Sequence, residues 1–195
     1  MKLLVKDFAV EAAEFEELDA AAGLPPQAVA AANAAGKADA VAAKHPDDWV
    51  LGADTIIVLD GRIYGKPRDL AEARSFLQSF SGRCHECMTA VAVRQKKSNK
   101  KIDFVTISQV RFHELDDRLI DEYLAKVPVL DKAGAYGIQE YGNMLVESID
   151  GELENIIGLP VTALKERLEA SAIDWSEFNR GNGKSSFEIT ANQEQ

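Results

Sequence analysis

The stretch that decides the fold is WVLGADTIIVLDGRIYGKP, residues 49–67. An apolar run with β-branched residues leads to Asp60-Gly61, and a short second run follows it. Asp-Gly between two apolar runs is typical of a tight two-residue turn. The stretch therefore predicts a β-hairpin, around which the rest of the chain can be placed.

Segments on both sides of this hairpin predict helices. Residues 26–44 are alanine-rich, which favours a helix. Residues 69–80 begin with Asp69, and Glu72 three positions later gives the form of a capping box before an apolar stripe. Further helices are expected over residues 114–126 and from Pro160 onward.

The remaining apolar runs predict strands. Residues 85–94 and 102–112 are expected to form two strands joined by QKKSNK, and residues 144–149 to form another. Helices and strands alternate without an internal repeat, which indicates the α/β class. Residues 1–174 are expected to form a single domain, and the polar, patternless residues 175–195 a disordered tail.

Composition excludes several classes of protein. The 46% hydrophobic and 28% charged fractions of the 195 residues are typical of a soluble globular protein. A net charge of −10 argues against a nucleic-acid binder, which needs a basic surface. No apolar run approaches the roughly 20 residues that cross a bilayer. Two cysteines and no secretory signal favour the cytoplasm.

Polar side chains in and after the hairpin are candidates for chemistry. Asp54 and Thr55 stand in the middle of an apolar strand, where a carboxylate is costly unless it is paired or bound to a cation. Lys66 follows the returning strand and could approach the Asp54 end of the sheet. Each also has a plain structural interpretation: a buried hydrogen-bonding Asp and a solvated surface Lys.

A long loop, DKAGAYGIQEYGNMLVESIDG, residues 131–151, carries more polar groups than an ordinary connection. Lys132 and Gln139 stand between glycines that let backbone approach a ligand. A hydrogen-bonded turn cluster is the structural alternative. Together with the hairpin, the loop supplies a metal-ready acid, ammonium groups for phosphates and an amide that can read a base edge.

Cys84 and Cys87 form a C-x-x-C motif around His85, but no second pair completes a zinc site. On a strand the two cysteines would also face opposite sides. We therefore expect neither a metal nor a redox role for them, and a structural role for His85.

Four motifs in register carry a resemblance to a known family. They are GADTIIVLDGRIYGKP, SGRCHECMTAVAV, DKAGAYGIQEYG and IDGELENIIGLPV, and over roughly residues 8–170 the chain resembles the Maf family of nucleoside triphosphate pyrophosphatases. The resemblance implies a mixed twisted sheet with flanking helices and two lobes around a deep cleft. It also implies hydrolysis of a triphosphate between its α- and β-phosphates with a divalent metal, Mg or Mn, and a homodimer.

The same resemblance implies roles for individual residues. The ADT and YGIQ motifs are similar to the branch that acts on dTTP, UTP and modified pyrimidine nucleotides. Asp54 would be the proton acceptor that activates water, Asp54 and Glu17 metal ligands, Thr55 and Gln139 base-selecting groups, and Lys66 and Lys37 phosphate-neutralising groups.

Members of this family also carry a Ser-x-Ser-Pro-Arg-Arg segment that gathers triphosphate oxygens, and Met1–Val10 aligns after it. Two function classes therefore stay open: an active pyrophosphatase, and a catalytically weakened nucleotide-binding or interaction protein linked to cell division. We expect residues 1–195 alone to hydrolyse dTTP or UTP weakly or not at all, and a version extended upstream to be active.

Overall fold

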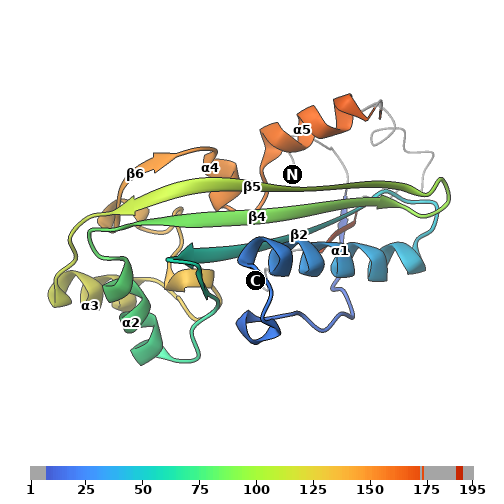
Figure 1. The fold of residues 1–195 in the computed structure, drawn as a ribbon. Helices are drawn as coiled ribbons and strands as arrows, with labels where there is room; N and C mark the ends of the chain where they lie inside the picture. Colours follow the sequence, from blue (N-terminus) through green and yellow to red (C-terminus); the bar gives the residue numbers. More distant parts are fainter. Residues whose placement is uncertain (1–7, 172, 174–187, 191–195) are drawn as a thin grey trace.

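The computed structural model describes residues 8–171, 173 and 188–190, in which helices and strands alternate along the chain (Figure 1). The helices are α1 (Pro26–Lys44), α2 (Leu70–Phe80), α3 (Asp117–Lys126), α4 (Leu153–Ile156) and α5 (Val161–Ala170), with short 3₁₀ turns at Ala20–Ala22, Ala133–Ala135 and Gly142–Met144. The strands are β1 (Ala9–Val10), β2 (Val50–Leu59), β3 (Arg62–Tyr64), β4 (Cys84–Gln95), β5 (Lys100–Phe112), β6 (Val146–Asp150) and β7 (Glu188–Thr190).

These strands form one mixed sheet. Its order is β1-β7-β2-β4-β5-β6, and β3 pairs with β2 off this path. Strands β3, β2, β4, β5 and β6 pair antiparallel, whereas β7 runs parallel to both β2 and β1. The α/β class and the mixed sheet expected from the sequence are confirmed.

The predicted hairpin is the β2–β3 pair. Asp60 and Gly61 take positive φ angles of 52° and 75°, which is the backbone that a two-residue turn of this kind requires. Leu59 and Arg62 therefore face each other directly across the turn. The Asp-Gly pair was sufficient to predict the hairpin, because a two-residue turn depends mainly on the backbone preferences of these two residues.

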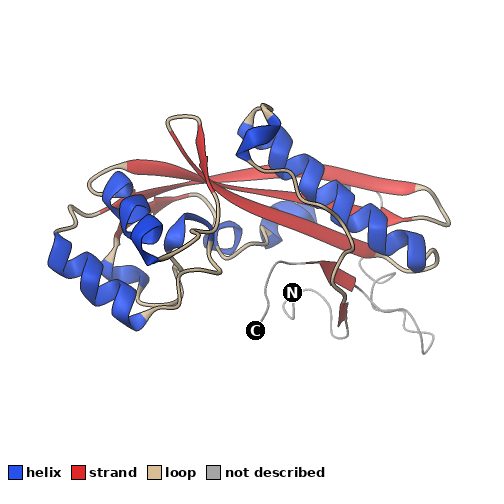
Figure 2. Cartoon of the chain, turned by 90° about the horizontal axis from the view of Figure 1, so that it is seen from below, coloured by secondary structure: helices blue, strands red, loops and turns tan. Residues whose placement is uncertain are grey.

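Helices cover both faces of the sheet and gather at its two ends. Helix α1 lies along one face beside β2, α5 lies on the other side, and α2 and α3 form a group at the far end (Figures 1 and 2). Three clusters of buried apolar side chains result, one under α1, one under α5 and one around α2 and α3. The middle of β2 lies between them.

The structure adds elements that the sequence did not predict. Helix α4 has only four residues, too few for a helical period to show. Glu188–Thr190, which lie in the segment expected to form a tail, form β7 on the outer edge of β2. A strand edge offers unpaired backbone groups that even a polar segment can bond. The predicted tail otherwise lies outside the described residues.

In the described part of the chain, every helix is too short or too polar to cross a bilayer.

Candidate active site

A buried ion-pair cluster joins three of the residues singled out in the sequence. Asp54 lies in the middle of β2 and is only 6% exposed. The Nζ atom of Lys37, on α1, lies 2.7 Å from Asp54 Oδ1 and 3.0 Å from Glu17 Oε1. One ammonium group therefore holds two carboxylates, one buried and one partly exposed, at the same point.

Asn33 completes this cluster from one helical turn before Lys37. Its Nδ2 donates to Asp54 Oδ2 at 3.3 Å and to the Leu18 carbonyl at 3.0 Å, and its Oδ1 accepts from the Leu18 N–H at 2.8 Å. Asn33 thus fastens the segment that carries Glu17 to α1 and orients the Asp54 carboxylate. We did not identify it from the sequence, although Asn33 and Lys37 are four residues apart and share a helix face.

Small residues explain why α1 approaches β2 closely enough for these contacts. A Cβ atom at Gly52 would clash with the Ala34 carbonyl oxygen and lie 2.9 Å from the Ala38 nitrogen. Both alanines are buried against the strand. The alanine-rich sequence therefore serves close packing as well as helix propensity, and it brings Lys37 to Asp54.

Burial and charge act in opposite directions on Asp54. Desolvation raises the pKa of its carboxyl above the 3.8 of an ordinary Asp, and Lys37, followed by the hydrogen bond from Asn33, opposes this rise. A carboxylate whose pKa is raised is a better proton acceptor than an ordinary surface Asp.

Thr55 belongs to the opposite face of the sheet, because successive strand residues point to opposite sides. Its Oγ1 lies 2.9 Å from Oγ1 of Thr89, its direct partner on β4. Thr89 in turn donates to the carbonyl oxygen of Asn155 at 2.9 Å. Thr89 and Asn155 lie in two of the motifs quoted above, but we did not single them out, because their contacts join residues 34 and 66 positions apart along the chain.

The outer edge of β2, between the face of Asp54 and the face of Thr55, is only partly paired with the other described strands. The outer edge of β2 pairs with β7 at Val50–Gly52 and with β3 at Ile57–Leu59. Among the described residues, no strand pairs with the stretch 53–56 on that side. Within this stretch Thr55 is partly exposed, whereas Ala53, Asp54 and Ile56 are buried.

The glycine-rich loop is anchored beside the hairpin. The Gly134 N–H donates to the Gly65 carbonyl at 3.0 Å, and a Cβ at Gly134 would lie 2.9 Å from Ile57. Its φ of +71° also favours glycine. This docking brings the segments that carry Lys66 and Gln139 together.

Lys66 and Gln139 are exposed, and neither forms a side-chain hydrogen bond or ion pair within the described part of the chain. Lys132, by contrast, pairs with Asp131 and Glu140 at 3.0 and 3.3 Å and ties its own loop. The structure thus unites Asp54, Lys37 and Glu17, and within the described residues neither Lys66 nor Gln139 contacts that cluster.

The donors at this cluster suit a hard cation. Asp54 and Glu17 offer only carboxylate oxygens, and no group of three or more His, Cys, Asp or Glu side chains with metal-site geometry exists within the described residues. Mg²⁺ is commonly held by one or two carboxylates plus substrate phosphates and water. The residues present therefore fit a metal that arrives with a phosphate ligand.

The two cysteines of the C-x-x-C motif differ in exposure. Cys84 is exposed and Cys87 is buried, so the two thiols face opposite sides of β4. Burial raises the pKa of Cys87 to about 12, which keeps it a neutral thiol. His85 Nε2 lies 2.9 Å from the Tyr136 hydroxyl, and burial lowers the pKa of His85 to about 4.

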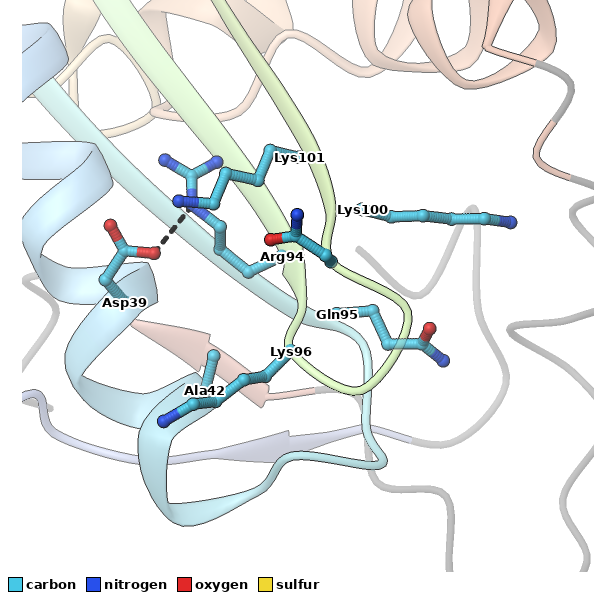
Figure 3. A pocket seen from close by; sticks show the side chains of 8 residues that line it. Asp39, Ala42, Arg94, Gln95, Lys96, Lys100 and Lys101 are labelled. Atoms are coloured by element: carbon cyan, nitrogen blue, oxygen red, sulfur yellow. Dashed lines mark hydrogen bonds and ion pairs between the residues drawn. The ribbon is translucent and has the colours of Figure 1, made fainter.

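A separate cavity of about 260 Å³ lies at the far end of the β4–β5 hairpin (Figure 3). Arg94 at its base is already paired, with Asp39 Oδ1 at 2.8 Å and with Asp103 Oδ1 at 2.7 Å. Lys96 and Lys101 point toward the α1 side of this cavity. None of the residues of the Asp54 cluster lines it.

Comparison with known proteins identifies the family of this chain. Residues 1–171 match the Maf-like protein family. A dTTP/UTP pyrophosphatase of Akkermansia muciniphila is 46% identical over 154 residues, which cover 79% of this chain and 80% of the relative. A dTTP/UTP pyrophosphatase of Bacillus cytotoxicus is 44% identical over 162 residues, 83% of each chain. The chain belongs to the Maf family.

Proposed function

We propose that this protein hydrolyses dTTP and UTP, or modified pyrimidine triphosphates, to the monophosphate and pyrophosphate. The observation that carries the proposal is the buried Asp54 carboxylate, paired with Lys37 beside Glu17 at an open strand edge. Two relatives, 46% identical over 154 residues and 44% identical over 162 residues, are dTTP/UTP pyrophosphatases by name.

In the proposed reaction, Asp54 acts as the general base. The water oxygen bonds to the α-phosphorus, the bond from that phosphorus to the bridging oxygen breaks, and pyrophosphate leaves. The proton of the water passes to a carboxylate oxygen of Asp54, whose raised pKa favours this transfer. Products and reactants balance without any other reagent.

A divalent metal, Mg or Mn, belongs to the proposal. Asp54 and Glu17 would hold it, and when bound it would neutralise phosphate charge and acidify water. Lys37 is 4% exposed and already contacts both carboxylates. We therefore assign Lys37 to holding these acids in place, rather than to the direct contact with phosphate that the resemblance implied.

Two exposed residues complete the proposed site. Lys66 would pair with the departing phosphates, and Gln139 would read the base together with Thr55. The glycines of the loop let its backbone approach the nucleotide. A cytoplasmic location and a homodimer are also part of the proposal, and they rest on the free cysteines and the family resemblance respectively.

Hydrolysis of UTP in ¹⁸O-water tests the position of attack. Attack at the α-phosphorus places the label in UMP and leaves pyrophosphate unlabelled, as ³¹P NMR or mass spectrometry would show. Label in pyrophosphate, or release of orthophosphate as the first product, would contradict the proposed reaction.

A further inference from the structure

The hydroxyl groups of Thr55 and Thr89 form a chain whose direction can be deduced. The two residues are direct cross-strand partners on β2 and β4, and their Oγ1 atoms lie 2.9 Å apart. Thr89 Oγ1 also lies 2.9 Å from the Asn155 carbonyl oxygen. Thr89 is fully buried, so water does not compete for either contact.

Counting hydrogens fixes the direction. A carbonyl oxygen can only accept, so the single hydroxyl hydrogen of Thr89 must lie between Thr89 and Asn155. The contact between Thr55 and Thr89 also needs a hydrogen, because two bare oxygens 2.9 Å apart would repel. Only Thr55 can supply it. The Thr55 hydroxyl therefore donates inward and has only lone pairs left for a ligand.

Thr55 can present these lone pairs outward. Its side chain is partly exposed and lies at the open stretch of the β2 edge. A Cβ atom at Gly158 would lie 3.6 Å from Thr55 Oγ1, so glycine there leaves the space beside the oxygen open. The φ of +111° at Gly158 disfavours other residues at this position.

Asn155 holds the inner end of the chain rigidly. Its Nδ2 donates to the Cys87 carbonyl and to Ser108 Oγ, both at 3.0 Å, and its carbonyl also accepts the Gly158 N–H. Asn155 is fully buried. The acceptor of the Thr89 hydrogen is thus fixed in place, and the direction of the chain is built into the fold.

We propose that Thr89 fixes Thr55 as a hydrogen-bond acceptor, and that this polarity selects a base with a ring N–H donor over one with a ring nitrogen acceptor. Uracil and thymine carry such an N–H at N3, whereas N3 of cytosine is an acceptor. Two acceptors facing each other leave a polar atom unpaired, which disfavours cytosine. The inference rests on the proposed function. It assigns Thr89 as a positioning residue for specificity.

The test compares kcat/KM for UTP and CTP in Thr89→Val. Valine keeps the shape but gives Thr55 no acceptor, so the Thr55 hydrogen can turn outward and donate to N3 of cytosine. We expect kcat/KM for CTP to rise and the UTP:CTP ratio to fall about tenfold, the scale of one neutral hydrogen bond. A variant that merely disturbs the fold would lose activity on both nucleotides.

Two control variants separate polarity from packing. Thr89→Ser keeps the hydroxyl and should keep the ratio. Ser108→Ala removes one partner of Asn155 but leaves the hydroxyl chain intact, so it should change kcat/KM for both nucleotides by the same factor. The inference is overturned if the UTP:CTP ratio is unchanged in folded Thr89→Val. It is also overturned if Ser108→Ala lowers this ratio as much as Thr89→Val does.

If the wild-type protein releases no pyrophosphate, that result overturns the proposed function. The inference about Thr89 is then tested by nucleotide binding. Titration calorimetry with UMP and CMP then measures base preference without hydrolysis. The wild-type protein should bind UMP more tightly than CMP, and Thr89→Val should reduce this difference in affinity. The inference is overturned if the wild type binds UMP and CMP equally, or if Thr89→Val shows the same preference for UMP as the wild type.

Discussion

Asp54 owes its proposed role to a balance among its immediate neighbours. Burial raises its pKa, and Lys37 and Asn33 limit the rise. Catalysis requires the ionised form, so activity should fall as pH drops through this raised pKa. The acid limb of the pH–rate profile should therefore lie above the 3.8 of an ordinary Asp.

Asn33→Ala should move this acid limb to higher pH, because it removes a hydrogen bond that favours the ionised carboxylate. The measurement is the pH profile of kcat/KM for UTP. Asn99→Gly is the matched control, since Asn99 lies in the β4–β5 turn with a positive φ that glycine also adopts. An acid limb in Asn33→Ala that coincides with wild type would contradict this role for Asn33.

Only some of the residues at the candidate site could be predicted from the sequence. Asp54 could be found because an acid in an apolar strand is costly, and the resemblance supplied Lys37 and Glu17. Asn33, Thr89 and Asn155 could not, because an amide or hydroxyl in a helix or strand has many ordinary roles. Their partners become visible only when distant segments meet.

At the scale of elements, the site depends on how closely α1 lies on β2. Gly52 is the point of contact, since a Cβ there would clash with the Ala34 backbone. The alanine-rich sequence of α1 and the long apolar runs of β4 and β5 were enough to predict these elements. The four-residue α4 and three-residue β7 have too little pattern to predict, and packing places them.

Gly52→Ala should destabilise the protein by about 1–3 kcal/mol, the usual cost of overpacking, and should lower activity by moving Lys37 away from Asp54. Urea unfolding and pyrophosphate release measure the two effects. Gly65→Ala is the control, because Gly65 has a negative-φ backbone and no atom within 4 Å of its Cβ position. Equal stability of the two variants would contradict close α1–β2 packing at this glycine.

At the scale of the whole molecule, a buried aromatic cluster links the sheet to the Gln139 loop. His85 on β4 packs against the tilted ring of Phe80 and edge-on against Phe112. It also forms a hydrogen bond with Tyr136, which belongs to the loop. Burial lowers the pKa of His85 from 6.5 to about 4. The unfolded chain therefore binds a proton between these pH values more readily than the folded protein does.

His85 should thus make stability depend on pH. Its contribution is full above pH 6.5 and is lost as pH falls toward about 4, by roughly 3 kcal/mol in all. His85→Gln should flatten this part of the stability curve, measured by urea unfolding from pH 7 to 4. His113→Gln, at an exposed position, should keep the wild-type slope. Identical slopes in both variants would contradict the burial of a neutral His85.

The proposed function requires that the Asp54 carboxylate, rather than the fold alone, performs the chemistry. The most direct measurement is pyrophosphate release from dTTP and UTP with Mg²⁺ or Mn²⁺ by Asp54→Asn and by Asp60→Asn. Asp60 lies in the exposed turn at the end of the same strand, where Asn also tolerates the positive φ.

We predict that Asp54→Asn lowers turnover relative to wild type by about 100-fold or more, the scale of a general base, and stays folded. Asp60→Asn should keep the wild-type rate. Near-wild-type pyrophosphate release by folded Asp54→Asn would contradict the account.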